Sequence, residues 1–170
     1  MTPIGRLLRH AGATHWRTRM LFPKRTLDAI EQAVVRAERT HAGEIRFAIE
    51  TALPPLAVLN GMSSRERAHE VFARLRVWDT ERNNGVLVYL QVADRTVEIV
   101  ADRGLSGRVS GGEWEAVCRL MEEHFREGHF EAGCIAGVDA IGNLLAHHFP
   151  AGTGPVLPVH NQLPDQPTLL

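Results

Sequence analysis

The stretch Leu75–Leu105, LRVWDTERNNGVLVYLQVADRTVEIVADRGL, decides the fold. It contains two runs rich in valine, isoleucine, leucine and tyrosine, Gly85–Val92 and Val97–Ala101, which are typical of strands. Only the short polar turn Ala93–Thr96 separates them, so the two strands must pair antiparallel. The residues before the first strand and after the second therefore lie at one edge of the sheet.

The elements before this hairpin follow from hydrophobic periodicity. Apolar residues recur at helical spacing after Thr26, which we expect to be the N-cap, and the helix ends near Gly43. Glu44–Glu50 alternates between apolar and polar residues and predicts a strand. A second helix begins at the capping-box pattern Ser63–Glu66 and runs to about Arg76. Because this helix separates two strands, we expect those strands to be parallel, with a right-handed crossover.

Two further helices are predicted after the hairpin. The first begins at the capping box Ser110–Glu113, and the second runs from about Phe130 to His147 and is nearly all small or apolar through its first half, so it should be buried. Together the elements predict an α/β fold, a three-layer α/β/α sandwich in which a small mixed sheet is flanked by helices, over residues 26–150. The expected core residues are Phe47, Phe72, Leu87, Ile99, Val117 and Ile141.

Two segments lie outside this domain. Residues 1–25 carry six basic side chains and no acid, a charge of +6 against −7 for the rest of the chain. Apolar residues such as Trp16 and Phe22 are interleaved with these charges, which is the composition of an amphipathic arm that lies on an anionic membrane surface. A short helix folded back on the acidic domain is the alternative. Residues 151–170 are rich in proline and lack periodicity, so we expect a flexible tail.

Composition narrows the function classes. No apolar run reaches the roughly 18 to 20 residues of a membrane span, and no signal-peptide pattern follows Met1, so we expect a cytoplasmic protein, peripheral to the inner membrane face if it binds a membrane. Cys118 and Cys134 lie in apolar helical patterns and should be packed thiols rather than a disulfide or a zinc site. One short basic arm on an acidic body argues against nucleic-acid binding.

The predicted topology gathers acidic residues at one sheet edge, and three of them, Glu44, Asp79 and Asp102, are candidate metal ligands. Carboxylate oxygens are ligands that calcium and magnesium prefer, so either cation is a candidate cofactor. Arginines of the same edge, such as Arg76 and Arg103, offer a second interpretation, in which salt bridges brace the loops without a metal. Both interpretations remain open from the sequence.

Several short motifs, in this order along the chain, resemble the TPM domain family, in its compact branch without a signal peptide. They are His41–Arg46, Arg74–Thr80, Asn83–Leu87, Ala93–Arg95, Ile99–Gly104 and Phe125–Phe130. The resemblance implies a three-layer α/β/α domain tied to membrane-protein maintenance, some members of which bind calcium or show weak acid phosphatase activity. Members of the longer, secreted branch carry two further oxygen ligands that this chain lacks around Leu105–Ser110.

The chain contains no phosphate-cradling glycine loop, no nucleophile elbow and no HExxH helix, and we predict no catalytic or cofactor-binding residues. We therefore expect a non-catalytic TPM-like interaction domain that works with a protein partner, which the sequence does not identify, at the cytoplasmic membrane face. The first alternative is a divalent-metal-dependent phosphatase-like hydrolase that uses the acidic edge. The second is a structural calcium-binding domain, in which a cation orders the loops.

Overall fold

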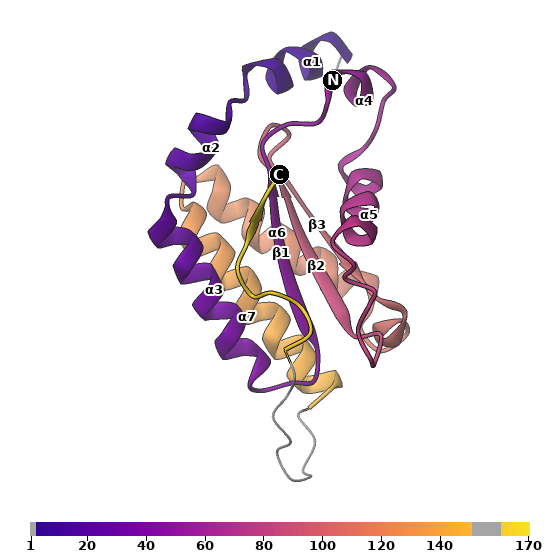
Figure 1. Ribbon diagram of the computed structural model, residues 1–170. Helices are drawn as coiled ribbons and strands as arrows, with labels where there is room; N and C mark the ends of the chain where they lie inside the picture. Colours follow the sequence, from indigo (N-terminus) through magenta and orange to yellow (C-terminus); the bar gives the residue numbers. More distant parts are fainter. Residues whose placement is uncertain (1–2, 151–160) are drawn as a thin grey trace.

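The computed structural model describes residues 3–150 and 161–170 (Figure 1). In chain order its helices are α1 (Pro3–Gly12), α2 (His15–Leu21), α3 (Lys24–Glu38), α4 (Pro55–Leu59), α5 (Ser64–Arg74), a short 3-10 helix η1 (Arg103–Leu105), α6 (Gly111–Arg126) and α7 (Phe130–His148). The strands are β1 (Glu44–Glu50), β2 (Gly85–Gln91), β3 (Thr96–Ala101) and β4 (Thr168–Leu169). They form one sheet in the order β3-β2-β1-β4.

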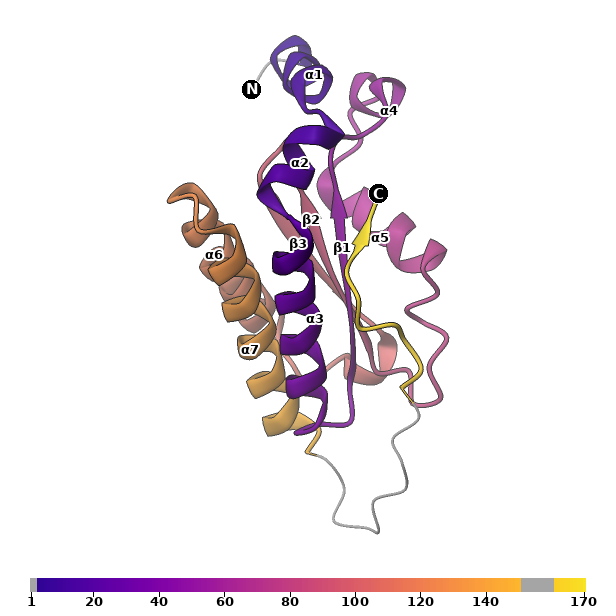
Figure 2. The same ribbon diagram turned by 60° about the vertical axis from the view of Figure 1, so that its left-hand side comes forward.

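The pairing of the first three strands confirms the topology expected from the hairpin and the crossover. β1 runs parallel to β2, with Glu44 opposite Gly85, and β2 pairs antiparallel with β3, with Val86 opposite Ala101. Helices α3, α6 and α7 cover one face of the sheet and α5 covers the other (Figures 1 and 2). The protein is therefore the three-layer α/β/α sandwich with a mixed sheet that the sequence predicts.

The two faces of the sheet follow the period-two pattern of its strands. On β1, Ile45, Phe47 and Ile49 pack in the larger core together with buried residues of α3, α6 and α7. Ala48 points the other way and joins Leu87 and other residues in a smaller core beneath α5. The alternation thus decides which helices each side chain meets.

The close packing of α6 against α7 depends on glycines that the sequence places one turn apart. A Cβ atom built at Gly133 would lie 2.7 Å from the ring of Phe125, and one at Gly137 would clash with the side chain of Met121. Both neighbours belong to α6, so only glycine allows the two helices to approach this closely. The predicted burial of α7 thus holds for the face that carries Gly133, Cys134, Gly137, Val138, Ile141, Gly142 and Leu145.

Helix caps are confirmed at two of the three predicted places. The capping boxes of Ser63 and Ser110 are present at the starts of α5 and α6. At α3, however, the N-cap is Pro23 rather than Thr26, and the helix begins at Lys24. The Thr26 hydroxyl instead donates a hydrogen bond to Glu131 of α7, at 2.5 Å, so a tertiary contact replaces the expected cap.

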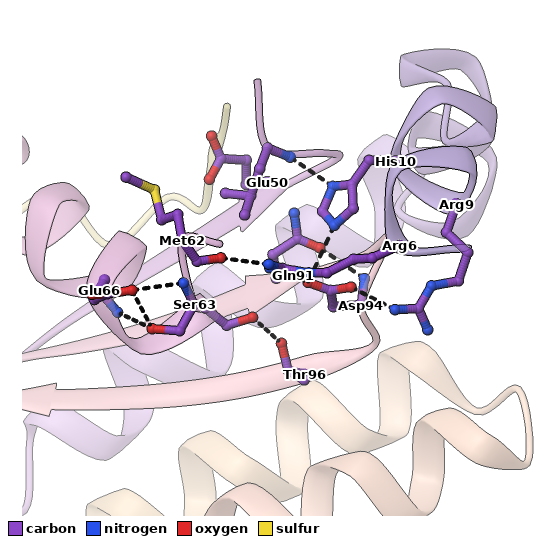
Figure 3. Close-up of polar contacts among 12 residues, drawn as sticks. Arg6, Arg9, His10, Glu50, Met62, Ser63, Glu66, Gln91, Asp94 and Thr96 are labelled. Carbon is purple, nitrogen blue, oxygen red and sulfur yellow. Dashed lines mark hydrogen bonds and ion pairs between the residues drawn. The ribbon is translucent and has the colours of Figure 1, made fainter. Parts of the chain in front are cut away.

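The N-terminal residues of the described chain are folded against the domain. Arg6 and Arg9 of α1 form ion pairs of 2.7 and 2.8 Å with Asp94, in the turn between β2 and β3 (Figure 3). His10 is buried beside them, and its Nδ1 accepts the Leu53 amide at 3.0 Å. Farther along, Phe22 belongs to the larger core, so the predicted boundary at residue 26 does not separate an arm from a domain.

The C-terminal segment corrects the expectation of a flexible tail for residues 161–170. These residues run along the outer edge of β1, and Thr168 and Leu169 pair with Ala48 and Ile49 as the parallel strand β4 (Figure 2). An extended, proline-rich segment suits an edge strand, because an edge strand needs hydrogen bonds on one side only. Residues 151–160, the other part of the predicted tail, lie outside the described residues.

The core prediction holds for five of the six residues, since Phe72 is only partly buried at the margin of the smaller core. Phe47→Ala should lower the free energy of unfolding by about 3–5 kcal/mol, because Phe47 is 0% exposed. Phe72→Ala should cost less than about 2 kcal/mol, because its ring is already partly solvated. Denaturant unfolding of both variants measures the difference, and equal losses would contradict this assignment of the two rings.

Candidate functional site

We call the end of the sheet where β1 and β2 begin and β3 ends the acidic edge. It carries two of the three predicted metal ligands. Glu44 starts β1 opposite Gly85, and Asp102 directly follows the last residue of β3. The Asp102 amide also donates to the Gly85 carbonyl at 2.9 Å. The topology therefore brings Glu44 and Asp102 to one edge, as expected from the strand order.

The carboxylate of Glu44 is engaged by the C-terminal segment. Its Oε2 accepts the backbone amides of Gln162 and Leu163, both at 3.3 Å. The side chain is also buried, with 5% of its surface exposed. Glu44 thus binds main chain of the same molecule, a role that the sequence pattern did not indicate.

Asp102 serves as a cap. Its Oδ1 accepts the Arg103 amide at 2.7 Å at the start of η1, while its Oδ2 is buried and has no hydrogen-bond partner among residues 3–150 and 161–170. In the same described ranges Asp102 forms no ion pair, and the Arg103 guanidinium donates instead to the Asn83 side-chain oxygen at 2.9 Å. The predicted bracing of the loops by Asp102 salt bridges is therefore not what the structure shows.

Asp79 is exposed in the loop before β2, where its amide donates to the Arg76 carbonyl at 2.9 Å. Within the described part of the chain, no three His, Cys, Asp or Glu side chains converge in an arrangement that could hold a metal ion. Calcium takes about six to eight oxygen ligands. Glu44, Asp79 and Asp102 do not form such a cluster in the described ranges.

Close backbone contacts hold the two loops of this edge together. The Gly104 amide donates to the Asn83 carbonyl at 2.8 Å, and a Cβ at Gly104 would clash with that same oxygen. A Cβ at Gly85 would clash with the Val77 carbonyl in the same way. Glycine is required at both positions, because backbone from the neighbouring loop occupies the space that a side chain would need.

A hollow of about 340 Å³ opens beside these loops. Its lining includes two arginines and no acidic side chain, and its residues are Ala42, Arg82, Asn84, Gly104, Arg108, His148, Phe149 and Pro150. The Arg108 guanidinium lies 4.8 Å from the centre of the Phe149 ring. The hollow is therefore electrostatically suited to an anion rather than to a cation.

His41 is the histidine that directly precedes the acidic edge, and the structure gives it a structural role. It is buried, and its Nδ1 accepts the Gly43 amide at 3.1 Å in the turn between α3 and β1. Burial lowers the pKa of His41 to about 4, because the charged ring would lose its hydration. The ring is therefore neutral near pH 7.

Glu38 is a titratable residue that sequence reasoning missed. Burial raises its pKa to about 8, with further contributions from the nearby carboxylates of Glu44 and Asp165, although it also accepts the Ile45 amide at 2.7 Å. Glu38 lies at the end of α3, and Asp165 lies in the C-terminal segment. No local pattern could have found this group, because its burial, the main cause of the raised pKa, arises from tertiary packing.

The raised pKa of Glu38 predicts a pH dependence of stability. The folded state favours the protonated carboxyl of Glu38. The protonated group therefore stabilises the folded state fully below about pH 4.5, and this stabilisation is lost as the pH rises to about 8. Glu38→Gln should remove that loss, since the amide stays neutral and can still accept the Ile45 amide. The free energy of unfolding of Glu38→Gln minus that of wild type should increase from about pH 4.5 to about pH 8 and stay constant at higher pH. A constant difference would contradict the raised pKa.

The capping role of Asp102 predicts the effects of substitution and of calcium. Asp102→Ala should lower the free energy of unfolding by about 0.5–2 kcal/mol, whereas Asp102→Asn should cost less, because its amide oxygen can still cap Arg103. Excess calcium should leave the melting temperatures of wild type and Asp102→Asn unchanged, since only a bound ligand stabilises the folded state. A calcium-induced rise that Asp102→Asn abolishes would identify Asp102 as a ligand.

Solved structures with the same architecture support the fold. The NMR structure of the BA42 protein from the psychrophilic bacterium Bizionia argentinensis is similar over 86% of this chain and 93% of its own, with 29% sequence identity and a TM-score of 0.73. The NMR structure of the N-terminal domain of a protein from P. gingivalis matches 71% of this chain and 76% of its own, with 22% identity and a TM-score of 0.54. The second likeness is one of fold alone.

A search of curated proteins found no match. Comparison with protein families matches residues 18–144 to the TPM domain. This match spans most of the chain, including all of α3 to α6, strands β1 to β3 and both loops of the acidic edge. The chain therefore belongs to the TPM domain family.

Proposed function

We propose that the protein is a non-catalytic interaction domain that docks on an anionic membrane surface through α1, α2 and α4, at the cytoplasmic face, in keeping with the membrane-protein maintenance that the family resemblance implies. One observation carries the proposal. Of the eight large apolar side chains exposed in the described residues, six lie on these three helices, and they are Ile4, Leu8, Trp16, Met20, Leu56 and Leu59. Exposed apolar groups gathered in this way mark interaction sites. We call these six residues the apical patch.

Helical spacing places the members of the apical patch in pairs. Ile4 and Leu8 are four residues apart on α1, and Trp16 and Met20 are four apart on α2, so each pair shares one side of its helix. Helix α1 lies beside α4, which contributes Leu56 and Leu59 (Figures 1 and 2). The patch therefore caps the end of the sandwich opposite the edge that carries Asp102.

The basic residues of the N-terminal segment divide into two groups. Arg6 and Arg9 both pair with the single carboxylate of Asp94, and Lys24 pairs with Asp28 at 2.8 Å. Arg17, Arg19 and Arg25 are exposed, and within residues 3–150 and 161–170 they form no ion pair. Three of the six basic residues of the segment thus remain available for anionic lipid headgroups, and two of them, Arg17 and Arg19, follow Trp16 on α2.

The geometry favours a domain that lies on a membrane. None of the helices in the described ranges is long and apolar enough to span a bilayer. Short amphipathic helices with exposed aromatic, aliphatic and basic side chains bind the plane of the interface instead. Neither alternative that relies on a cation at the acidic edge gains an observation of this kind from the structure.

Vesicle sedimentation tests the proposal. The wild type should bind vesicles that contain phosphatidylglycerol more tightly than pure phosphatidylcholine vesicles, and added salt should weaken this binding, since salt screens exposed charges within about 8 Å at physiological ionic strength. The double variant Leu8→Ser, Trp16→Ser should bind at least about tenfold more weakly, because it removes buried apolar area from the interface.

The matched control is Trp78→Ser. Trp78 is also exposed, by 50%, but it lies in the loop at the opposite end of the sheet, so its replacement should leave vesicle binding unchanged. Arg17→Gln with Arg19→Gln should reduce both the affinity and its salt dependence. A wild-type protein that ignores anionic vesicles at low salt would rule out the membrane part of the proposal.

A further inference from the structure

The outer edge of β1 is covered by residues 161–170, but little of that contact is regular strand pairing. Only Thr168 and Leu169 are in register with β1, and the Leu170 amide adds one hydrogen bond to the Ile49 carbonyl at 2.8 Å. The rest of the segment is held by side chains of β1. Two of these side chains, Glu44 and Arg46, are charged and buried.

Glu44 and Arg46 contact the main chain of the segment. Glu44 accepts two successive amides, those of Gln162 and Leu163. The Arg46 guanidinium donates to the carbonyls of Pro164 and Gln166, the latter at 2.9 Å, and also to the Thr168 hydroxyl. An extended segment of another sequence offers the same amides and carbonyls, so these contacts select an extended backbone more than a particular sequence.

Apolar side chains of the segment supply the sequence preference. Leu163 is buried and Leu170 partly buried in the smaller core beneath α5, and Pro167 is buried as well. The β1 edge therefore accepts a pattern of three side chains. The pattern is a leucine, a proline four positions later, and an apolar residue three positions after the proline. The intervening Pro164, Gln166 and Leu169 are exposed.

The two charges are costly unless a partner backbone is present. Buried charged groups destabilise a protein when their hydrogen bonds are missing, so the burial of Glu44 and Arg46 favours an extended backbone along this edge. The match to the family ends at residue 144. The receptor residues on β1 thus lie inside the matched domain, while the segment that occupies them lies outside it.

We propose that the β1 edge is a binding site for an extended segment of a partner protein, and that residues 161–170 occupy it as an intramolecular ligand. This rests on the interaction-domain part of the proposed function and is independent of the membrane surface. The partner's segment carries the leucine, proline and apolar spacing and adds to the sheet where β4 lies. The partner must displace residues 161–170, so this segment lowers the apparent affinity of the β1 edge for the partner.

The test uses a fluorescently labelled synthetic peptide with the sequence of residues 161–170, added to the full-length chain. The full-length variant Leu163→Ser weakens the intramolecular contact and should bind the peptide at least about tenfold more tightly than wild type, because a tethered competitor acts at an effective concentration on the order of 1 mM. Adding Arg46→Gln to this variant should abolish the gain. A peptide that itself carries Leu163→Ser is the negative control.

Two further measurements make the outcome decisive. In wild-type hydrogen exchange, the Leu170 amide should be at least about a hundredfold less protected than that of Val88 in central β2, because the segment opens without global unfolding. Equal protection, or no peptide binding by folded Leu163→Ser, would overturn the proposal. A dimer with exchanged C-terminal segments would overturn the assignment to a partner protein. Vesicle binding by Leu163→Ser should equal that of wild type, so the two proposals fail separately.

Discussion

The charged side of β1 is the constraint on which the arrangement of the α5 layer depends. Glu44, Arg46 and Glu50 alternate with the apolar residues of this strand, so all three point away from the larger core and are nevertheless buried. Buried charges require partners. Arg67 of α5 pairs with Glu50 at 2.7 Å, and the C-terminal segment satisfies Glu44 and Arg46. One strand thereby determines the position of a helix and of a distant segment.

The two ends of the sheet have different chemistry. At one end, Asp94 in the turn after β2 binds Arg6 and Arg9, and this contact holds α1 where its apolar side chains face outward (Figure 3). At the other end, Asp102 and Asn83 are used in caps and loop contacts, and the neighbouring hollow is basic. The acidic side chains of this protein thus serve mainly to position its own backbone and its cationic residues.

The candidate site was only partly predictable, for a physical reason. Strand order places Glu44 and Asp102 at one edge, and a sequence pattern reveals strand order. Whether a carboxylate turns toward a metal, an arginine or a backbone amide depends on what else reaches it. For Glu44 that partner is the segment around Leu163, more than a hundred residues away. Burial raises the pKa of Glu38, and Asp165 of the same segment adds to it.

The sequence by itself determined the hairpin, the parallel crossover, the two capping boxes and the burial of α7, because period, turn length and cap chemistry are local properties. The tertiary structure alone decided where the ends of the chain lie. A basic amphipathic segment and a proline-rich tail have no internal signal for docking, since each is held by contacts with residues distant in the sequence, such as Asp94 for α1 and Arg46 for residues 161–170. Such contacts between distant residues leave no period in the sequence that could reveal them.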